Sequence, residues 1–222
     1  MRAWIRSNRG FLLFLAGFLF FRTAVADWNP VPTGSMRPAI LEGDVVWVER
    51  VAYDWKVPLT NFSLQRVADP QRGDVVVFDS PADGSRLIKR IVGVPGDRIE
   101  LRNDVLIVNG ERARYSNATA LEEWVAPGVQ VPAIRSTESV QGQQRVVQHL
   151  PGVAARRDLA PLTLGPDQFF MMGDNRDNSF DSRFLGPVDR RLINGRARRI
   201  LVSADLADHW LPRWHRIGAR LE

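Results

Sequence analysis

The sequence predicts a mainly β fold: a coiled antiparallel β-sheet domain with an inserted lobe, preceded by one N-terminal transmembrane helix. Short runs rich in β-branched residues recur between residues 44 and 108, and Gly-Asp turns separate them. One apolar stretch of helical length precedes these runs, and no helical periodicity competes with them. With 222 residues, of which 45% are hydrophobic, the chain is long enough to bury a core.

Residues 1–26 are predicted to be a cytoplasmic N-terminus followed by a transmembrane anchor. Gly10–Ala26 is apolar apart from Arg22, and at about 1.5 Å per residue it spans roughly 25 Å, the short end of what crosses a bilayer. The arginines that precede it predict an N-terminus inside the cell and a single pass. The alternative is a cleaved signal peptide, because Ala24-Val25-Ala26 fits an Ala-x-Ala cleavage site. In both cases the remaining chain is exported.

A β domain is predicted from residues 27–110 and 163–204. Prolines at positions 30, 32 and 38 exclude a helix at its start. Strands are expected at Asp44–Val51, Asp74–Phe78, Arg86–Val94, Arg98–Val108, Gln168–Met172 and Arg196–Ser203. Asn103-Asp104 should form a hairpin turn and Asn109-Gly110 a further turn, because these residue types tolerate left-handed backbone conformations.

Two further segments differ from the β domain. Residues 111–162 are predicted to be an inserted lobe, since polar and small residues dominate and Pro-Gly pairs interrupt them. Residues 205–222 form a tail in which apolar residues, including Trp210 and Trp214, lie between arginines at helical spacing. Either the tail docks on the domain, or it makes a second contact with a membrane surface.

The composition excludes several kinds of site. The chain has no cysteine, which rules out disulfides, thiolate zinc sites and a cysteine nucleophile. His149, His209 and His215 lie apart from the other candidate residues, which argues against a histidine metal site or a Ser-His-Asp triad. A net charge of +5 suits a lipid surface or nucleic acid, but many Arg-rich chains bind neither. We expect no metal, no cofactor and no nucleic acid partner.

Three segments carry candidate functional groups. Ser35 follows a glycine, so its hydroxyl can project from a tight turn. Lys89 shares one face of its strand with two large aliphatic residues, and burial there would lower its pKa and make it a candidate general base. Residues 173–183 form a loop dense in Asp, Asn and Ser. Each pattern alone also fits an ordinary turn or an exposed side chain.

Taken together, these segments resemble the bacterial type I signal peptidases. Pro32–Pro38 is similar to that family's Ser-Gly-Ser-Met-x-Pro box, and Ile88–Asp97 matches its lysine box nearly residue for residue. Arg72–Phe78 and Gly173–Arg183 resemble two further boxes, and all four occur in the family's order.

The resemblance implies a serine–lysine pair in which Ser35 is the nucleophile and Lys89 the general base. It further implies that Ser179 hydrogen-bonds the lysine and orients it. Asp181 and Arg183 would form a supporting ion pair.

The resemblance also implies how the substrate is held. The oxyanion would be stabilised by the backbone N–H of Ser35 and the hydroxyl of Thr33, where many family members have serine. The substrate would lie extended beside the segments near residues 28–32 and 79–82. The expected substrate-binding residues are Val31, Pro32, Met36, Asp79, Ser80, Pro81 and Ala82.

The function implied is a membrane-anchored serine endopeptidase that removes N-terminal signal peptides from exported preproteins after an Ala-x-Ala-type site. We expect a monomer in the cytoplasmic membrane, in contact with lipid, with its catalytic domain on the outer side. Cleavage of its own anchor after Ala26 is a further hypothesis. The rival interpretations are a specialised peptidase for a conjugation or pilus component, and a non-catalytic, membrane-tethered peptide-binding module. A further alternative, a self-cleaving repressor with a serine–lysine pair, is disfavoured, because it would need a DNA-binding helix pair at the place where the apolar segment lies.

Overall fold

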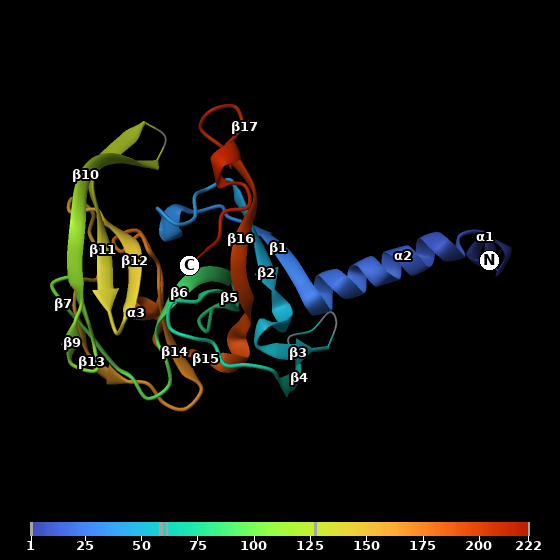
Figure 1. The fold of residues 1–222 in the computed structure, drawn as a ribbon, viewed down its shortest axis with the longest axis horizontal. Helices are drawn as coiled ribbons and strands as arrows, with labels where there is room; N and C mark the ends of the chain where they lie inside the picture. Colours follow the sequence, from blue (N-terminus) through green and yellow to red (C-terminus); the bar gives the residue numbers. More distant parts are fainter. Residues whose placement is uncertain (1, 58–59, 61, 127, 222) are drawn as a thin grey trace.

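A computed structural model describes residues 2–57, 60, 62–126 and 128–221. The chain is mainly β and antiparallel, as the sequence predicts. Figure 1 shows a curled main sheet, a second group of strands beside it, and a helical arm that projects from the main sheet.

The main sheet has eight strands within the described residues, in the order β1-β2-β16-β5-β6-β14-β15, with β17 paired to β16. Their bounds are Ala26–Pro30 (β1), Asp44–Glu49 (β2), Val75–Asp79 (β5), Arg86–Gly93 (β6), Gln168–Met172 (β14), Val188–Asp189 (β15), Ile193–Asp205 (β16) and Leu211–Pro212 (β17). Each strand predicted in this part of the chain is present. All the pairings are antiparallel.

The remaining strands form smaller sheets. One has the order β13-β7-β8-β9 and another the order β10-β11-β12, while β3 pairs with β4. Their bounds are Asp54–Lys56 (β3), Ser63–Arg66 (β4), Arg98–Arg102 (β7), Val105–Val108 (β8), Glu111–Arg112 (β9), Arg114–Ala126 (β10), Val129–Val140 (β11), Gln143–His149 (β12) and Leu159–Thr163 (β13). We call β7–β13, residues 98–163, the second lobe.

The predicted hairpin turn lies between β7 and β8. Asn103 and Asp104 have φ values of 48° and 65°, the left-handed geometry that a two-residue hairpin turn requires. Strands β7 and β8 pair with β13 and β9 rather than with the main sheet. The inserted lobe was expected to begin only at residue 111, and that division of the chain stays a prediction.

Successive side chains of β5 pack into two different cores, which lie on opposite faces of the main sheet. Val75 and Val77 belong to a cluster with Met36 and Ile40, whereas Val76 and Phe78 belong to a second cluster. Successive side chains of a strand point to opposite faces, so a strand covered on both sides is apolar at every position. A third cluster joins the second lobe to the main sheet, because it contains Ile99 and Leu106 of the lobe together with Phe170 and Met172 of β14.

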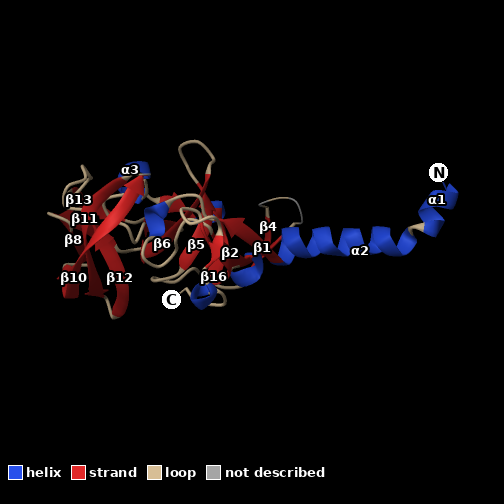
Figure 2. Cartoon of the chain, turned by 90° about the horizontal axis from the view of Figure 1, so that it is seen from above, coloured by secondary structure: helices blue, strands red, loops and turns tan. Residues whose placement is uncertain are grey.

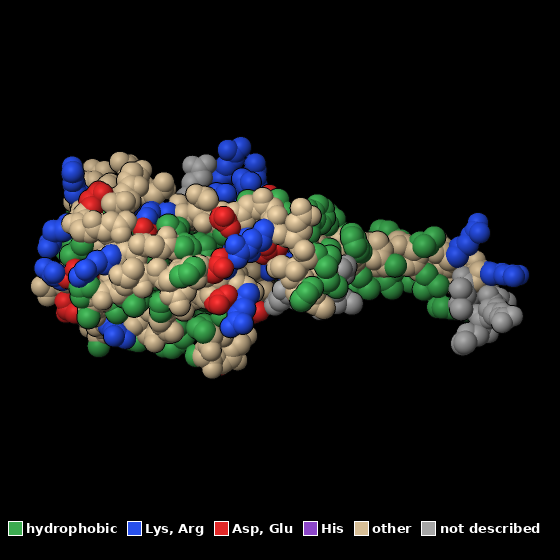
Figure 3. Space-filling model, turned by 90° about the horizontal axis from the view of Figure 1, so that it is seen from below, with side chains coloured by type: hydrophobic (Ala, Val, Ile, Leu, Met, Phe, Trp, Pro, Cys, Tyr) green, Lys and Arg blue, Asp and Glu red, His purple; other side chains and the backbone are tan. Residues whose placement is uncertain are grey.

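The helical arm consists of α1 (Arg2–Ser7), α2 (Arg9–Phe20) and a wider helical turn at Phe21–Val25. It extends away from the sheets in both ribbon views (Figures 1 and 2). Figure 3 shows hydrophobic side chains over much of its visible face and basic side chains near its far end. Among the residues described, none of the helices is long and apolar enough to cross a membrane. The transmembrane helix therefore stays a prediction.

The C-terminal tail docks on the main sheet. Leu221 is buried in the cluster that contains Met36, and Arg216 forms an ion pair with Asp44 at 2.7 Å. Trp210 and Trp214 are 70% and 76% exposed, so docking leaves their rings free for other contacts. A short helix, α3 (Ser182–Leu185), follows the polar loop after β14.

Candidate active site

Ser35 lies in a short helical turn, Gly34–Met36, between β1 and β2. The full burial of Met36 in the core fixes one end of this turn. A Cβ added at Gly34 would lie 2.6 Å from the Glu42 Oε1 atom, so a larger residue here would force the Glu42 side chain to shift. The turn therefore packs tightly on the groups behind it, and the Ser35 side chain faces β6.

Lys89 lies on β6 and faces Ser35. Its Nζ atom is 2.7 Å from the Ser35 Oγ atom and 2.9 Å from the carbonyl oxygen of Ile88. The lysine is 3% exposed, so of the two possibilities that the strand pattern left open, a buried and an exposed side chain, the structure shows the buried one. Although Ser35 and Lys89 are 54 positions apart in sequence, the sheet brings them within hydrogen-bond distance.

Burial changes the acid–base chemistry of Lys89. Desolvation disfavours the ammonium form and lowers the pKa to about 8, although the carboxylates of Asp181 and Asp174 oppose the change. An amine with this pKa is partly neutral near physiological pH. It can therefore accept a proton from a hydroxyl at 2.7 Å.

Asp181 and Arg183 form the expected ion pair beneath this site. The Arg183 Nε atom lies 2.9 Å from Asp181 Oδ1, and both side chains are buried. Burial alone would raise the pKa of Asp181, but the hydrogen bond and charge of Arg183, with donors from Gly173 and Ser179, lower it. The carboxylate therefore stays charged next to Lys89.

Ser179 makes a different contact from the one expected. Its hydroxyl donates to Asp181 Oδ2 at 2.7 Å, and among the residues described it has no hydrogen bond to Lys89. Orientation of Lys89 by Ser179 therefore stays a prediction, and in this structure the Ser179 hydroxyl is directed to the carboxylate.

The loop after β14 packs directly against the Ser35 turn. A Cβ added at Gly173 would lie 2.3 Å from Ser179 Oγ and 2.4 Å from the carbonyl oxygen of Ser35. The backbone N–H of Asn175 donates to that same carbonyl at 3.1 Å, and its side-chain amide donates to the carbonyl of Gly34 at 3.0 Å. We did not single out Asn175 from the sequence, because it is one of several similar polar residues in the loop.

A cavity of about 250 Å³ opens beside Ser35 and Lys89. Of the expected substrate-binding residues, Val31 and Pro32 line it, and so does Thr33. Its other lining residues are Asn29, Pro30, Val46, Val77, Arg86, Leu87 and Ile88. The strand residues were missed because the sequence does not show which of the two faces of β5 and β6 borders the cavity.

The other expected substrate-binding residues lie elsewhere. Met36 is fully buried in the core, and Asp79, Ser80, Pro81 and Ala82 are absent from the cavity lining. Asp79 instead accepts a hydrogen bond from the side-chain amide of Asn194 at 2.7 Å. Within the described part of the chain, no three His, Asp or Glu side chains are grouped so as to hold a metal ion.

Comparison with known proteins gives consistent matches. A model of the family "Signal peptidase, peptidase S26" matches residues 1–202. A signal peptidase I from Pseudomonas aeruginosa is 32% identical over 234 aligned positions, which cover 96% of this chain and 78% of that protein. One from Rickettsia prowazekii is 33% identical, covering 85% and 76%. A crystal structure of a signal peptidase I from Enterococcus faecalis matches with 28% identity and a TM-score of 0.35, covering 59% of this chain and 97% of that one.

Proposed function

We propose that Ser35 and Lys89 catalyse the removal of signal peptides, since the chain belongs to the signal peptidase family, peptidase S26. The type I members of this family are hydrolases that act on substrates bearing signal peptides. Ser35 is the nucleophile and Lys89 the general base. The 2.7 Å separation of their side-chain atoms is the observation that carries the proposal. The lowered pKa of the lysine supports it, since a general base works best with a pKa near the operating pH.

The first half of the reaction forms an acyl-enzyme. Neutral Lys89 takes the proton of the Ser35 hydroxyl as the oxygen attacks the scissile carbonyl, and the resulting ammonium then protonates the leaving amine. The backbone N–H of Ser35 and the hydroxyl of Thr33 are the proposed donors to the oxyanion. A donor of this kind is worth about 3 kcal/mol of transition-state stabilisation.

The second half restores the enzyme. Lys89, neutral again after the amine leaves, removes a proton from water, and the hydroxide attacks the acyl carbonyl. The ammonium returns its proton to the Ser35 oxygen as the new carboxyl group departs. Asp181, Arg183 and Ser179 are proposed as supporting groups. The charge of Asp181 stabilises the ammonium form of Lys89, which exists between these proton transfers.

The substrate is proposed to bind as an extended peptide along residues 29–33, with backbone hydrogen bonds of the kind that add a strand to a sheet edge. The cavity supports this, because Val31, Val77 and Ile88 make part of its wall apolar. The cavity of about 250 Å³ has room for side chains of an extended peptide, and the Ala-x-Ala pattern is proposed for that peptide on the strength of the family resemblance. Met36 and residues 79–82 stay proposed substrate contacts. Because they do not line the cavity, a bound substrate would have to extend beyond it to contact them.

Residues 1–26 are proposed to anchor the enzyme in the cytoplasmic membrane, with the N-terminus inside and the catalytic domain outside as a monomer. The apolar side chains of α2 support this: Leu13 and Phe14 are 72% and 68% exposed, which has a cost in water and none in lipid. Exported preproteins and membrane lipid would then be its partners. Residues 27–110 and 163–204 are the proposed catalytic domain, with 111–162 as an insert and 205–222 as a tail.

The experiment that tests the mechanism is cleavage of a peptide with an Ala-x-Ala site by the detergent-purified full chain. Ser35→Ala and Lys89→Ala should each abolish cleavage, while the exposed serine variant Ser85→Ala should retain it. Cleavage that survives either of the first two changes would overturn the proposed pair. Cleavage by the parent chain that both substitutions abolish would also exclude a non-catalytic peptide-binding module, which would bind the peptide in the parent and in every variant without cutting it.

A further inference from the structure

The second lobe contacts both of the segments that carry the proposed catalytic groups. Glu123 on β10 forms an ion pair with Arg37, which is two residues after Ser35. Glu138 on β11 forms an ion pair with Arg176, which lies in the loop after β14. All four side chains are at most 19% exposed, so solvent screens these pairs only weakly. The lobe is therefore tied to the active site by charge as well as by packing.

The Glu123 carboxylate is held in place from within the lobe. Arg135 of β11 donates to its Oε2 atom at 2.8 Å, and the same guanidinium donates to the side-chain oxygen of Gln148 on β12 at 2.8 Å. The other oxygen, Oε1, accepts from Arg37. Because three strands of the lobe fix the carboxylate, it offers Arg37 a rigid partner.

Arg37 transmits this contact to the Ser35 turn. Its Nε atom lies 2.7 Å from Glu42 Oε2, and the pair packs directly behind Gly34, where an added Cβ would lie 2.6 Å from Glu42 and 3.0 Å from Arg37. Burial alone would lower the pKa of Arg37, but Glu42 and Glu123 outweigh burial and raise it. The guanidinium therefore stays charged, and it lies against the Gly34 position of the turn that carries Ser35.

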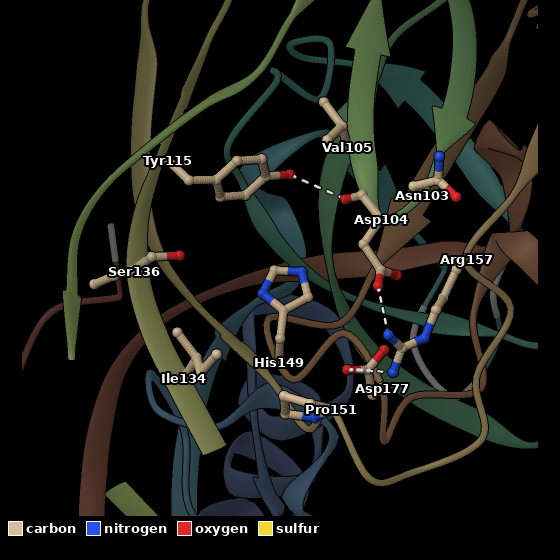
Figure 4. Close-up of a pocket in the computed structure, with 11 residues that line it drawn as sticks. Asn103, Asp104, Val105, Tyr115, Ile134, Ser136, His149, Pro151, Arg157 and Asp177 are labelled. Carbon is tan, nitrogen blue, oxygen red and sulfur yellow. Dashed lines mark hydrogen bonds and ion pairs between the residues drawn. The ribbon is translucent and has the colours of Figure 1, made fainter. Parts of the chain in front are cut away.

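The opposite side of the turn is also held by the lobe. The loop after β14 lies beside β12: Arg176 donates its N–H to the carbonyl of Gln148, and Asp177 accepts the N–H of Leu150 at 2.7 Å. Figure 4 shows the guanidinium of Arg157 between the carboxylates of Asp104 and Asp177. Since Asn175 of this loop donates to the carbonyls of Gly34 and Ser35, the turn is fixed from two directions.

We propose that Glu123 is a positioning residue for the Ser35 nucleophile, acting through Arg37, and that the second lobe thereby sets the geometry of the active site. This inference rests on the proposed function. Glu123 is absent from the cavity lining and thus has no part in substrate binding through the cavity. Misplacing a nucleophile by about 1 Å can reduce the rate about 100-fold, so loosening one of two restraints should reduce kcat about tenfold.

The test compares Glu123→Gln with Glu122→Gln in the full-length, detergent-purified chain. Glu122 is the adjacent residue of β10 and is exposed, so it is a matched control for the loss of one carboxylate. The measurements are kcat and KM for an Ala-x-Ala peptide, the pH dependence of kcat/KM, and the melting temperature. We expect Glu123→Gln to lower kcat about tenfold and to leave KM within about twofold of the parent value. The pH at which kcat/KM falls on the acid side of its profile should not move. Glu123→Asp, which keeps the charge, should recover part of the loss.

A double-mutant cycle with Arg37→Gln identifies the route of the effect. If Glu123 acts through Arg37, adding Glu123→Gln to Arg37→Gln should lower kcat no further. The proposal is overturned if Glu123→Gln matches Glu122→Gln within twofold, if the two effects multiply, or if the loss disappears on cooling below a lowered melting temperature. None of these outcomes tests the proposed roles of Ser35 and Lys89. Those roles would be refuted separately, by cleavage in the Ser35→Ala or Lys89→Ala variant.

Discussion

The pKa of Lys89 leads to a quantitative prediction about the pH dependence of cleavage. With a pKa of about 8, about one lysine in eleven is neutral at pH 7, whereas the ordinary value of 10.5 would leave about one in three thousand. Burial thus increases the active, neutral form about 300-fold at pH 7. Because the base must be neutral, kcat/KM should rise about tenfold per pH unit below pH 8 and level off above it.

The assay is steady-state cleavage of a signal-peptide substrate between pH 6 and 9, in buffers of matched ionic strength. Lys89→Arg is the matching variant, because a guanidinium keeps the positive charge and cannot lose its proton in this range. It should be inactive at every pH. A flat profile for the parent enzyme, or an acid limb centred near the ordinary lysine pKa, would refute the argument from burial. Cleavage by Lys89→Arg would refute the role of the lysine as base.

Three further predictions follow from the same contacts. Asp181→Asn removes a charge that raises the pKa of Lys89 and leaves Arg183, which lowers that pKa, so the acid limb of the pH profile should move below pH 8, and an unmoved acid limb would contradict the electrostatic argument. The melting temperature should also fall, since breaking a buried ion pair costs about 3–5 kcal/mol. Gly173→Ala places a methyl group 2.4 Å from the Ser35 carbonyl oxygen, so kcat should fall at least about 100-fold, and a rate within tenfold of the parent would contradict this packing. Edman sequencing of the membrane-purified protein should give the intact N-terminus, because Ala24 and Ala26 are buried and Ala26 pairs with Glu49; a new terminus at Asp27 would instead support self-cleavage.

Local sequence signals predicted much of the main sheet. The runs that became β2, β5, β6, β14 and β16 are β-branched and lie between turn residues, and their conformation depends mainly on neighbours in sequence. The turn at Asn103-Asp104 is of the same kind, because the left-handed backbone there suits those two residues. The long strands β10 and β11 were not predicted individually, since about half of their residues are polar and many of their side chains are exposed.

The sequence by itself determined which residues could supply the chemistry: a serine after a glycine, a lysine between aliphatic neighbours on one strand face, and a polar loop whose pattern resembles one family. Only the tertiary structure decided which atoms meet. It brought Lys89 to Ser35 across 54 positions and Arg37 to Glu123 across 86, and it directed the Ser179 hydroxyl to Asp181. The physical reason is that strand alternation and turns depend on local backbone preferences, whereas side-chain partners depend on how the sheet curls and on which buried charges must be paired.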